Sequence, residues 1–330
     1  MMLSHGALLR EAAATGFQAE PLEKAARLLQ ILESIRSHPF LKNRLALKGG
    51  TALNLFLFDV PRLSVDVDLN YTGASDRETM LLERPQVEQA LQAVFGRLGL
   101  RVRRVPTEHA GGKWRLSYET LSGRPGSLEV DLNFLMRTPL WPCQVRDSRA
   151  VGPFRATAIP VLDIHELAGG KLAALFGRNA SRDLFDVRNL LRDPGLDHQC
   201  LRLAFVVYGG CSRRDWRTIS LDDARADPVD VERQLIPMLR NQVGPDHLIG
   251  PGRSGIAAWS QELEAECREL LAGVLPLSDE EVAFLSLLND QGEIAPDRLA
   301  QDAEMKAIIR GHPGLHWKAL NVRERMKRGG

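Results

Sequence analysis

Two aspartates separated by a single residue are the part of this sequence with the most direct chemical meaning. Asp66 and Asp68 alternate with the apolar residues Val65, Val67 and Leu69. Because a β-strand points successive side chains to opposite faces, the two carboxylates share one face and the apolar residues pack on the other. Neighbouring carboxylates repel each other, and a hard divalent cation bound through oxygen removes that repulsion. The spacing therefore predicts a strand that binds Mg²⁺ above all, or Mn²⁺.

A pair of glycines upstream of this strand has the complementary chemistry. Gly49 and Gly50 follow a short apolar run, residues 45–47, and precede a helix-forming stretch, residues 52–58, with Thr51 in position to cap the helix. Without Cβ atoms the backbone can approach a ligand closely, and amides at a helix start point at an anion. A phosphate site beside a cation site predicts that the ligand is a nucleotide.

The elements around these motifs are expected to form a sheet with helices. Apolar residues recur at helical spacing over residues 21–36, and a second helix is expected to start at Pro85. Three extended runs follow at residues 100–105, 113–120 and 127–135, with Gly-rich turns between them. The N-terminal half is therefore expected to be α+β.

The last of these runs carries a candidate third carboxylate. Apolar residues occupy alternate positions of this run, and Glu129, Asp131 and Asn133 occupy the positions between them. A carboxylate on a neighbouring strand is what a two-metal phosphoryl-transfer site requires as a third ligand. We predict that Asp131 is this ligand and that Glu129 is the alternative. The competing interpretation is an acidic residue that faces solvent on an amphipathic strand.

The C-terminal half is expected to be helical. Residues 162–176 and 181–191 form two predicted helices, and the first contains Gly169–Gly170, which close packing or close approach of a ligand would explain. Further helices are expected near residues 201–208, 229–240, 257–271, 278–288 and 296–309. We therefore divide the chain into two domains, residues 1–160 and residues 161–330.

Composition describes an ordinary globular protein. The 330 residues carry 43 lysines and arginines against 42 aspartates and glutamates, so no overall field favours nucleic acid or a membrane. The four cysteines are scattered without zinc-ligand spacing and are expected to be thiols in a reducing compartment. The sequence has neither a signal-peptide pattern nor an apolar run of about 20 residues, so we expect no membrane contact and a cytoplasmic location.

Basic residues concentrate in two places. Residues 97–115 contain six basic residues and one acidic residue, and residues 301–330 contain seven and three. These segments could neutralise an RNA backbone if they flank the active site, and they could equally be solvated surface. Tryptophans that could stack on bases, or lie in the core, are Trp114, Trp141, Trp216 and Trp317.

The compound pattern resembles a known superfamily. A strand, Gly-Gly-Thr, a helix and a strand with Asp-x-Asp resemble the nucleotidyltransferases that include polymerase beta. More narrowly, KGGTAL (48–53) with RLSVDVDL (62–69) resembles the AbiEii/AbiGii toxin family, also seen in the MenT toxins. KLAALFGRNASRDLFDVRNLL (171–191) resembles its second and third motifs, and HPGLHWKALNVRE (312–324) its C-terminal end. The resemblance implies an α+β fold, a nucleotidyltransferase-fold mixed sheet with helices followed by a mostly helical C-terminal domain.

The resemblance also implies roles for individual residues. Lys171 would contact the nucleotide phosphates, and Asp186 would hold the site together or act on the attacking hydroxyl, so that the helical domain contributes both to the cleft. The implied catalytic residues are Asp66, Asp68, Lys171 and Asp186. The implied nucleotide-binding residues are Gly49, Gly50, Thr51, Ser64, Lys171, Arg178 and Arg182. The metal ligands would be Asp66, Asp68 and Asp131.

The function implied by this resemblance is a metal-dependent nucleotidyltransferase. It would transfer a nucleoside monophosphate from an NTP to RNA, with a tRNA 3′ end as the acceptor, as the toxin of a toxin–antitoxin system with a cognate antitoxin. Transfer to a protein or small-molecule hydroxyl keeps the chemistry and changes the acceptor. An inactive module that binds a nucleotide or a partner is the third interpretation, and the retained pair of aspartates disfavours it.

Overall fold

The structure is a computed structural model that describes residues 4–106, 110–240 and 253–329. The chain divides into two compact units. The first, here called the sheet unit, consists of Met1–Arg137, Cys143–Leu162 and Glu232–Gly255. The second, the helical unit, consists of Thr138–Pro142, Asp163–Val231 and Ile256–Gly330. Residues 232–255 thus belong to the sheet unit, although the sequence analysis assigned them to the C-terminal domain.

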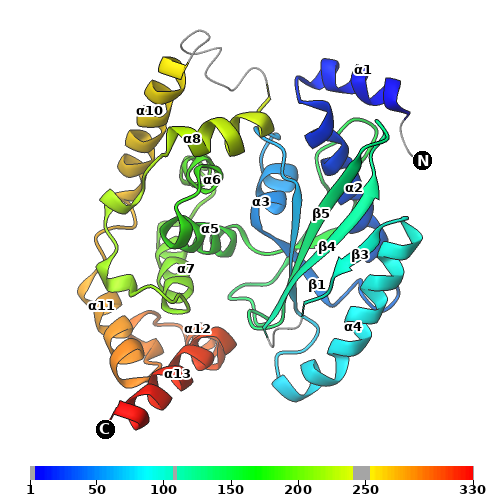
Figure 1. Ribbon diagram of the computed structural model, residues 1–330. Helices are drawn as coiled ribbons and strands as arrows, with labels where there is room; N and C mark the ends of the chain where they lie inside the picture. The colour runs from blue at the N-terminus through cyan, green and yellow to red at the C-terminus, as the bar shows by residue number, and fades with distance from the viewer. Residues whose placement is uncertain (1–3, 107–109, 241–252, 330) are drawn as a thin grey trace. The chain divides into compact units, whose positions relative to one another are not determined.

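A seven-stranded sheet organises the sheet unit (Figure 1). Its strands are β1 (Leu45–Lys48), β2 (Asp66–Tyr71), β3 (Arg101–Arg104), β4 (Gly111–Glu119), β5 (Pro125–Asn133), β6 (Gln144–Arg146) and β7 (Ile159–Val161). Across the sheet their order is β3-β4-β5-β2-β1-β7-β6. β2 lies between β1, which is antiparallel to it, and β5, which is parallel to it. The mixed sheet predicted from the sequence is confirmed, and the aspartate strand is at its centre.

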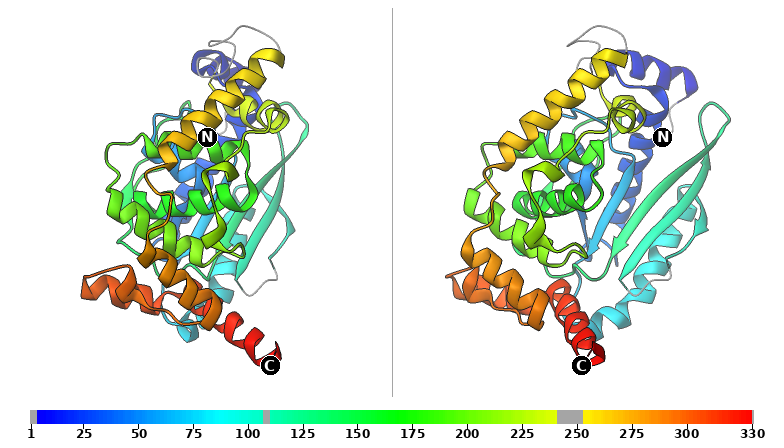
Figure 2. Two further views of the ribbon diagram at one scale, coloured as in Figure 1. Left: turned by 90° about the vertical axis from the view of Figure 1, so that its left-hand side faces the viewer. Right: turned by 60° about the vertical axis from the view of Figure 1, so that its left-hand side comes forward.

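The apolar face of this sheet packs against helices. Phe95 of α4 (Arg77–Arg97) contacts Trp114 of β4 edge-on, with ring centroids 5.7 Å apart. β4 and β5 form a long hairpin (Figure 2), and alternate residues of β5, such as Val130, are buried on the same face as Trp114. The opposite face of the same strands therefore carries the polar residues.

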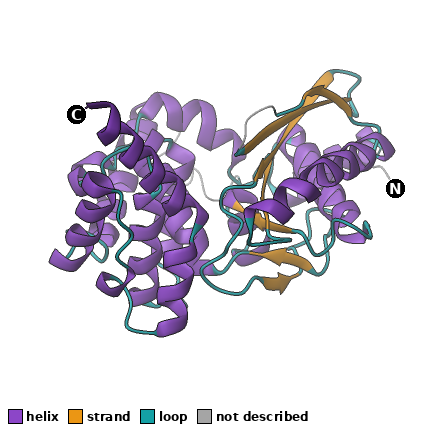
Figure 3. Ribbon diagram, turned by 90° about the horizontal axis from the view of Figure 1, so that it is seen from below, coloured by secondary structure: helices purple, strands orange, loops and turns teal. Residues whose placement is uncertain are grey.

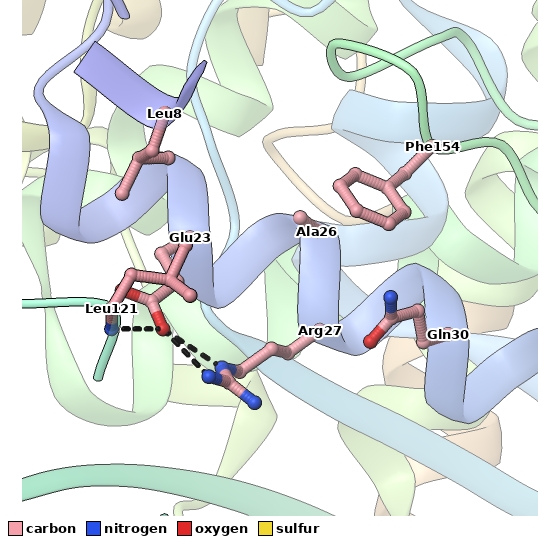
Figure 4. Close-up of a pocket in the computed structure, with 7 residues that line it drawn as sticks. All are labelled: Leu8, Glu23, Ala26, Arg27, Gln30, Leu121 and Phe154. Carbon is pink, nitrogen blue, oxygen red and sulfur yellow. Dashed lines mark hydrogen bonds and ion pairs between the residues drawn. The ribbon is translucent and has the colours of Figure 1, made fainter. Parts of the chain in front are cut away.

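A buried ion pair joins α2 (Ala19–Ser37) to the β4–β5 hairpin (Figure 4). Arg27 Nη2 lies 2.8 Å from Glu23 Oε1, and it also donates to the carbonyl of Glu119 at 3.1 Å. The Leu121 amide donates to both oxygens of Glu23 at 3.1 Å. The small pocket beside this pair has a volume of about 20 Å³, room for about one water molecule. This cluster is therefore structural.

The start of α4 differs from the prediction. Asp76 caps the helix by accepting a hydrogen bond from the Thr79 amide at 2.8 Å, so α4 begins at Arg77 and continues through Pro85. The prediction of a helix that starts at Pro85 is wrong. The side-chain cap upstream fixed the beginning of the helix, and the proline interrupts only one hydrogen bond of an already formed helix.

Further comparisons between predicted and observed helices concern two proline-containing segments and the two ends of the chain. The predicted helix 229–240 is present as a continuous but irregular helical segment, formed by α8 (Pro228–Asp230), η4 (Val231–Leu235) and η5 (Ile236–Met238), with Pro237 within η5. The predicted helix 296–309 divides into η7 (Pro296–Arg298) and α12 (Ala303–Gly311). Sequence analysis did not predict α1 (His5–Thr15) or α13 (Pro313–Gly329).

The helical unit consists of helices and short helical turns (Figure 3). Its main helices are α5 (Ile164–Arg178), α6 (Ser181–Leu191), α7 (His198–Gly210), most of α10 (Arg253–Leu271), α11 (Asp279–Ser286), α12 and α13. A Cβ on Gly169 of α5 would lie 2.8 Å from Ala204 Cβ of α7. Close packing of two helices therefore explains this glycine. Over the residues described, no helix is long and apolar enough to cross a membrane.

Candidate active site

The polar face of β2 carries the aspartate pair. Asp66 and Asp68 are half-buried, whereas Val67 and Leu69, which alternate with them, are buried. The alternation expected from the sequence is therefore present, and the two carboxylates lie on the same face of the sheet.

Asp131 of β5 lies beside this pair. In the parallel pairing of β2 with β5, Asp68 and Asp131 are directly opposed, on strands that are about 4.8 Å apart. Burial raises the pKa of Asp131, and the Asp68 carboxylate raises it further, whereas Lys48 and Lys113 lower it. Two carboxylates thus lie opposite each other, and burial is the main cause of the raised pKa of Asp131.

Glu129, the alternative third ligand, has different surroundings. It is opposed to Asp66 in the register, but its carboxylate pairs with Lys113 Nζ at 3.0 Å and with Arg115 Nη2 at 3.2 Å. The hydrogen bond from Lys113 holds the pKa of Glu129 below its ordinary value, although burial acts in the other direction. Since Glu129 is already neutralised, the geometry favours Asp131 of the two candidates.

The glycine turn lies against Asp68. Gly49 has φ +71°, and a Cβ there would lie 2.1 Å from Asp68 Oδ2. Any other residue at position 49 would clash with the carboxylate and adopt a strained backbone. Glycine at this position therefore allows the backbone to approach the aspartate strand, as the sequence analysis expected.

Thr51 differs from its predicted role as a helix cap. Lys48 is the N-cap of α3 (Gly49–Ala52), which continues directly into η1 (Leu53–Leu57), and Thr51 lies inside α3. Its side chain is buried, and its hydroxyl donates to the carbonyl of Asp66. Thr51 thus joins the glycine turn to β2, so the cap prediction is wrong.

The three carboxylates Asp66, Asp68 and Asp131 form the candidate site for a divalent cation. Among the residues that the structure describes, no three His, Cys, Asp or Glu side chains are gathered closely enough to hold an ion. The donor chemistry nevertheless suits Mg²⁺, because Asp66, Asp68 and Asp131 offer oxygen atoms on one face of adjacent strands. Burial is the largest cause of the raised pKa of Asp131, and a cation there would offset both this burial and the smaller effect of Asp68.

Lys171 and Asp186 belong to the helical unit, where they form a buried ion cluster. Lys171 Nζ lies 2.9 Å from both Asp183 Oδ1 and Asp186 Oδ2, and the three side chains are 7%, 2% and 0% exposed. Arg178 Nε adds a contact of 2.6 Å with Asp183 Oδ2. Burial alone would raise the pKa of Asp183, but Lys171 and Arg178 outweigh it and lower this pKa. The contact of Lys171 with phosphates stays a prediction.

The predicted residues thus fall into two groups. The sheet unit holds Gly49, Gly50, Thr51, Ser64, Asp66, Asp68 and Asp131, and the helical unit holds Lys171, Arg178, Arg182 and Asp186. Ser64 is buried just before β2, and Arg182 is half-buried on α6. Lys48 and Lys113 are opposed to Asp68 and Asp131 in the register. Neither lysine was predicted to lie beside the carboxylates, and Lys113 was predicted only as one of six basic residues that could neutralise RNA. Strand alternation could have placed both lysines on the polar face of the sheet. Only the strand register shows which carboxylate lies opposite each lysine.

Comparisons with known proteins identify the family and the fold. Residues 30–261 match the family model described as nucleotidyl transferase AbiEii toxin, Type IV TA system. The chain therefore belongs to the AbiEii family of nucleotidyltransferase toxins, which implies an NTP substrate and an antitoxin partner. Its fold is similar to that of MenT4, a nucleotidyltransferase toxin from Mycobacterium tuberculosis H37Rv, with a TM-score of 0.56 and 20% identity over 96% of this chain and 99% of that chain. A comparison with curated protein sequences found no match.

Proposed function

We propose that this nucleotidyltransferase transfers a nucleoside monophosphate from an NTP to a hydroxyl of an RNA acceptor, the 3′ end of a transfer RNA. The acceptor oxygen forms a bond to the α-phosphorus, the bond from that phosphorus to the β-phosphate oxygen breaks, and pyrophosphate leaves. The hydroxyl proton passes to solvent. A tRNA extended in this way could no longer be charged, which would account for a toxin's effect on growth.

The observation that carries this proposal is the position of Asp68. It lies against the Gly49 backbone on one side and opposite Asp131 on the other. Asp66, Asp68 and Asp131 would hold Mg²⁺, and the Gly49–Gly50 backbone would receive the phosphates. Bound Mg²⁺ would supply a lowered pKa for the acceptor hydroxyl and positive charge for the pyrophosphate.

Basic residues on the same face support a polyanionic acceptor. Lys113 and Arg115 of β4 each expose 58% of their side chains, and they stand beside β5 on the face that carries Asp131. Arg103 of β3 continues the row, since its Nε donates to Ser117 Oγ of β4 at 2.7 Å. This row would neutralise a phosphate backbone and would repel a cationic small molecule.

The contacts of Asp186 support one of its two implied roles. Its carboxylate is fully buried and paired with Lys171, so we propose that it holds the helical unit in shape rather than takes a proton from the acceptor. Asp66 and Asp68 would then be the carboxylates closest to the chemistry.

Labelled NTPs test the proposal. Purified protein is incubated with each α-³²P-labelled NTP and Mg²⁺, together with either total RNA or a protein lysate. Label in tRNA, lost when EDTA is added, is the expected result. Label confined to the protein fraction would overturn the RNA acceptor. No turnover with either fraction, in a protein that still arrests growth when expressed, would favour an inactive binding module.

A further inference from the structure

A second polar pocket lies wholly within the helical unit, beside α13, the red helix at the C-terminus in Figure 1. Its volume is about 360 Å³, within the range of roughly 300–1,000 Å³ found for small-molecule sites. The lining residues that matter here are Arg213, Asn289, Trp317, Lys318 and Arg325. None of them has a part in the nucleotidyl-transfer site proposed above.

The pocket has an excess of positive charge. Its lining includes four basic side chains and two carboxylates, those of Asp215 and Asp290. Both carboxylates are bound by Arg217, at 2.7 Å and 2.6 Å respectively, and Asp215 also interacts with Lys318. Four cations thus face two carboxylates. Lys318 donates to the Ser212 carbonyl. The excess of two positive charges is therefore available to an anion.

Arg213 and Arg325 are the exposed cations of this pocket. Arg325 Nη2 donates to the carbonyl of Asn289 at 3.4 Å, and that oxygen carries no formal charge. Within the part of the chain that the structure describes, Arg213 makes no ion pair. Exposed guanidinium groups such as these are suited to phosphate, which they bind through paired N–H donors.

Asn289 adds a polar atom that requires a partner. The side chain is 8% exposed, and its Nδ2 donates to Asp215 Oδ1 at 3.3 Å. A carboxylate only accepts hydrogen bonds, so this contact fixes which end of the amide is the oxygen. Asn289 Oδ1 is buried and has no hydrogen-bond partner among the described residues. A ligand with an N–H donor would satisfy it.

Trp317 supplies an aromatic surface. It is 41% exposed on α13, unlike Trp114 and Trp216, which are fully buried. An exposed indole next to arginines is a platform on which a nucleic-acid base can stack, with little dependence on sequence.

We propose that this pocket binds one unstacked nucleotide of the single-stranded acceptor, with its base on Trp317 and its phosphate against Arg213 and Arg325. Each of the four bases has an N–H donor on its pairing edge, so any of them could satisfy Asn289 Oδ1. The inference rests on the proposed RNA acceptor, and it adds a second contact with that acceptor, in the helical unit.

Binding without turnover tests the pocket. The full chain with Asp66→Ala, which is expected to be inactive, is titrated into a fluorescein-labelled single-stranded RNA, and anisotropy is recorded at several salt concentrations. Adding Trp317→Ala is expected to weaken binding by about 5- to 100-fold, the effect of losing one stacked base. Adding Arg213→Glu is expected to weaken binding and to lower the slope of log affinity against log salt by about 1.

Lys327→Glu is the matched control. Lys327 is exposed on the same helix but does not line the pocket, so the same change of charge there should leave affinity within about twofold. Equal weakening by Lys327→Glu and Arg213→Glu, or no effect of Trp317→Ala in a variant with an unchanged melting curve, would overturn the proposal.

The source of the nucleotide is decided by competition. Unlabelled single-stranded RNA should displace the labelled strand, whereas AMP at the same concentration should not. Displacement by AMP would mean that the pocket binds a free nucleotide and not a nucleotide of an RNA strand. Because binding is measured without catalysis, it remains decisive if transfer to RNA fails. Conversely, if Trp317→Ala and Arg213→Glu leave the labelling of RNA unchanged, the proposed function would stand and the proposed role of the pocket would be wrong.

Discussion

The sheet unit and the helical unit each contain a cluster of aspartates near a lysine, but the two clusters have opposite surroundings. In the helical unit, Asp183 and Asp186 are almost completely buried, and Lys171 and Arg178 balance their charge. In the sheet unit, Asp66, Asp68 and Asp131 are half-buried. Lys113, the lysine opposed to Asp131, forms an ion pair with Glu129 instead.

This difference teaches how to distinguish a structural cluster from a candidate active site. Buried charges are tolerated only when partners inside the protein neutralise them, and here Lys171 and Arg178 neutralise Asp183 and Asp186. The half-buried aspartates of the sheet face one another, and the pKa of Asp131 is raised as a result of burial and of Asp68. A half-buried cluster of this kind would be stabilised by a cation from outside the protein, as proposed above.

The largest expected effect is on catalysis. Asp68→Ala should reduce nucleotide incorporation by about 10³-fold or more, because the loss of a proposed metal ligand would remove several kcal/mol of transition-state stabilisation. Labelled-NTP incorporation into RNA measures this, with thermal unfolding as the check on the fold. Glu129→Gln is the matched control, since Glu129 is already paired with Lys113. Comparable loss of activity in both variants would remove the distinction between the two acids.

For the buried cluster of Lys171, Asp183 and Asp186, the expected effect is on stability. Lys171→Met should lower the free energy of unfolding by about 3–5 kcal/mol, because Asp183 and Asp186 would be left buried without their shared cation. Urea denaturation of this variant measures the change, beside Lys327→Met as an exposed control. If Lys171→Met unfolds at the same urea concentration as the unmodified chain, the interpretation of a structural cluster is wrong.

Glu166, another buried acid, extends the comparison, because no cation is paired with it among the residues that the structure describes. Burial raises the pKa of Glu166 to about 7, although hydrogen bonds from Tyr208 and from the Leu140 amide oppose this shift. Between the ordinary value of 4.5 and about 7, the folded chain holds a proton that the unfolded chain has released. Stability therefore falls as pH rises through this window, by at most about 3 kcal/mol.

Glu166→Gln should remove this part of the pH dependence. The amide keeps an acceptor for Leu140 and never ionises, so the variant should be more stable than the unmodified chain above pH 7 and similar to it near pH 4.5. Unfolding free energies at several pH values test this, with Glu269→Gln, an exposed position on α10, as the control. A parallel pH profile in the Glu166→Gln variant would show that Glu166 is ionised in the folded state.

The smallest expected effect on stability concerns the glycine turn. Gly49→Ala would place a Cβ 2.1 Å from Asp68 Oδ2 at φ +71°, and should destabilise the fold by about 1–2 kcal/mol while displacing Asp68. Gly96 of α4 is the control, since a Cβ there meets nothing within 4 Å. Gly96→Ala should be neutral or stabilising by up to about 1 kcal/mol. Thermal melts that rank the two variants in the opposite order would contradict the close approach of Gly49.

Local patterns were sufficient to predict the core of the candidate site. The alternation of Asp66 and Asp68 with buried residues, and the bend at Gly49, depend on interactions close in sequence. The neutralisation of Glu129 could not be predicted in this way, because it depends on which residues β4 places opposite β5. For the same reason, only the register of β1 and β2 shows that Lys48 lies opposite Asp68.

The helical unit was harder to predict for a different reason. A lysine and two aspartates on neighbouring helices have the same composition as a solvated surface, and only tertiary packing decides that Lys171 is buried. In the sheet unit, the start of α4 was also mispredicted, because the Asp76 side-chain cap, and not Pro85, determines where this helix begins. Fold class and motif positions were therefore predictable, whereas burial and partners of charged residues were not.

The parallel pairing of β2 with β5 has a consequence for the newly made protein. Asp68 and Asp131 are 63 positions apart in the chain, and β5 follows the β4 strand with which it forms the hairpin. A ribosome that has released only the first hundred residues has therefore synthesised Asp68 but not its neighbour. An incomplete translation product of this kind would carry Asp66 and Asp68 without Asp131, so the proposed set of three carboxylates would be incomplete until β5 is made.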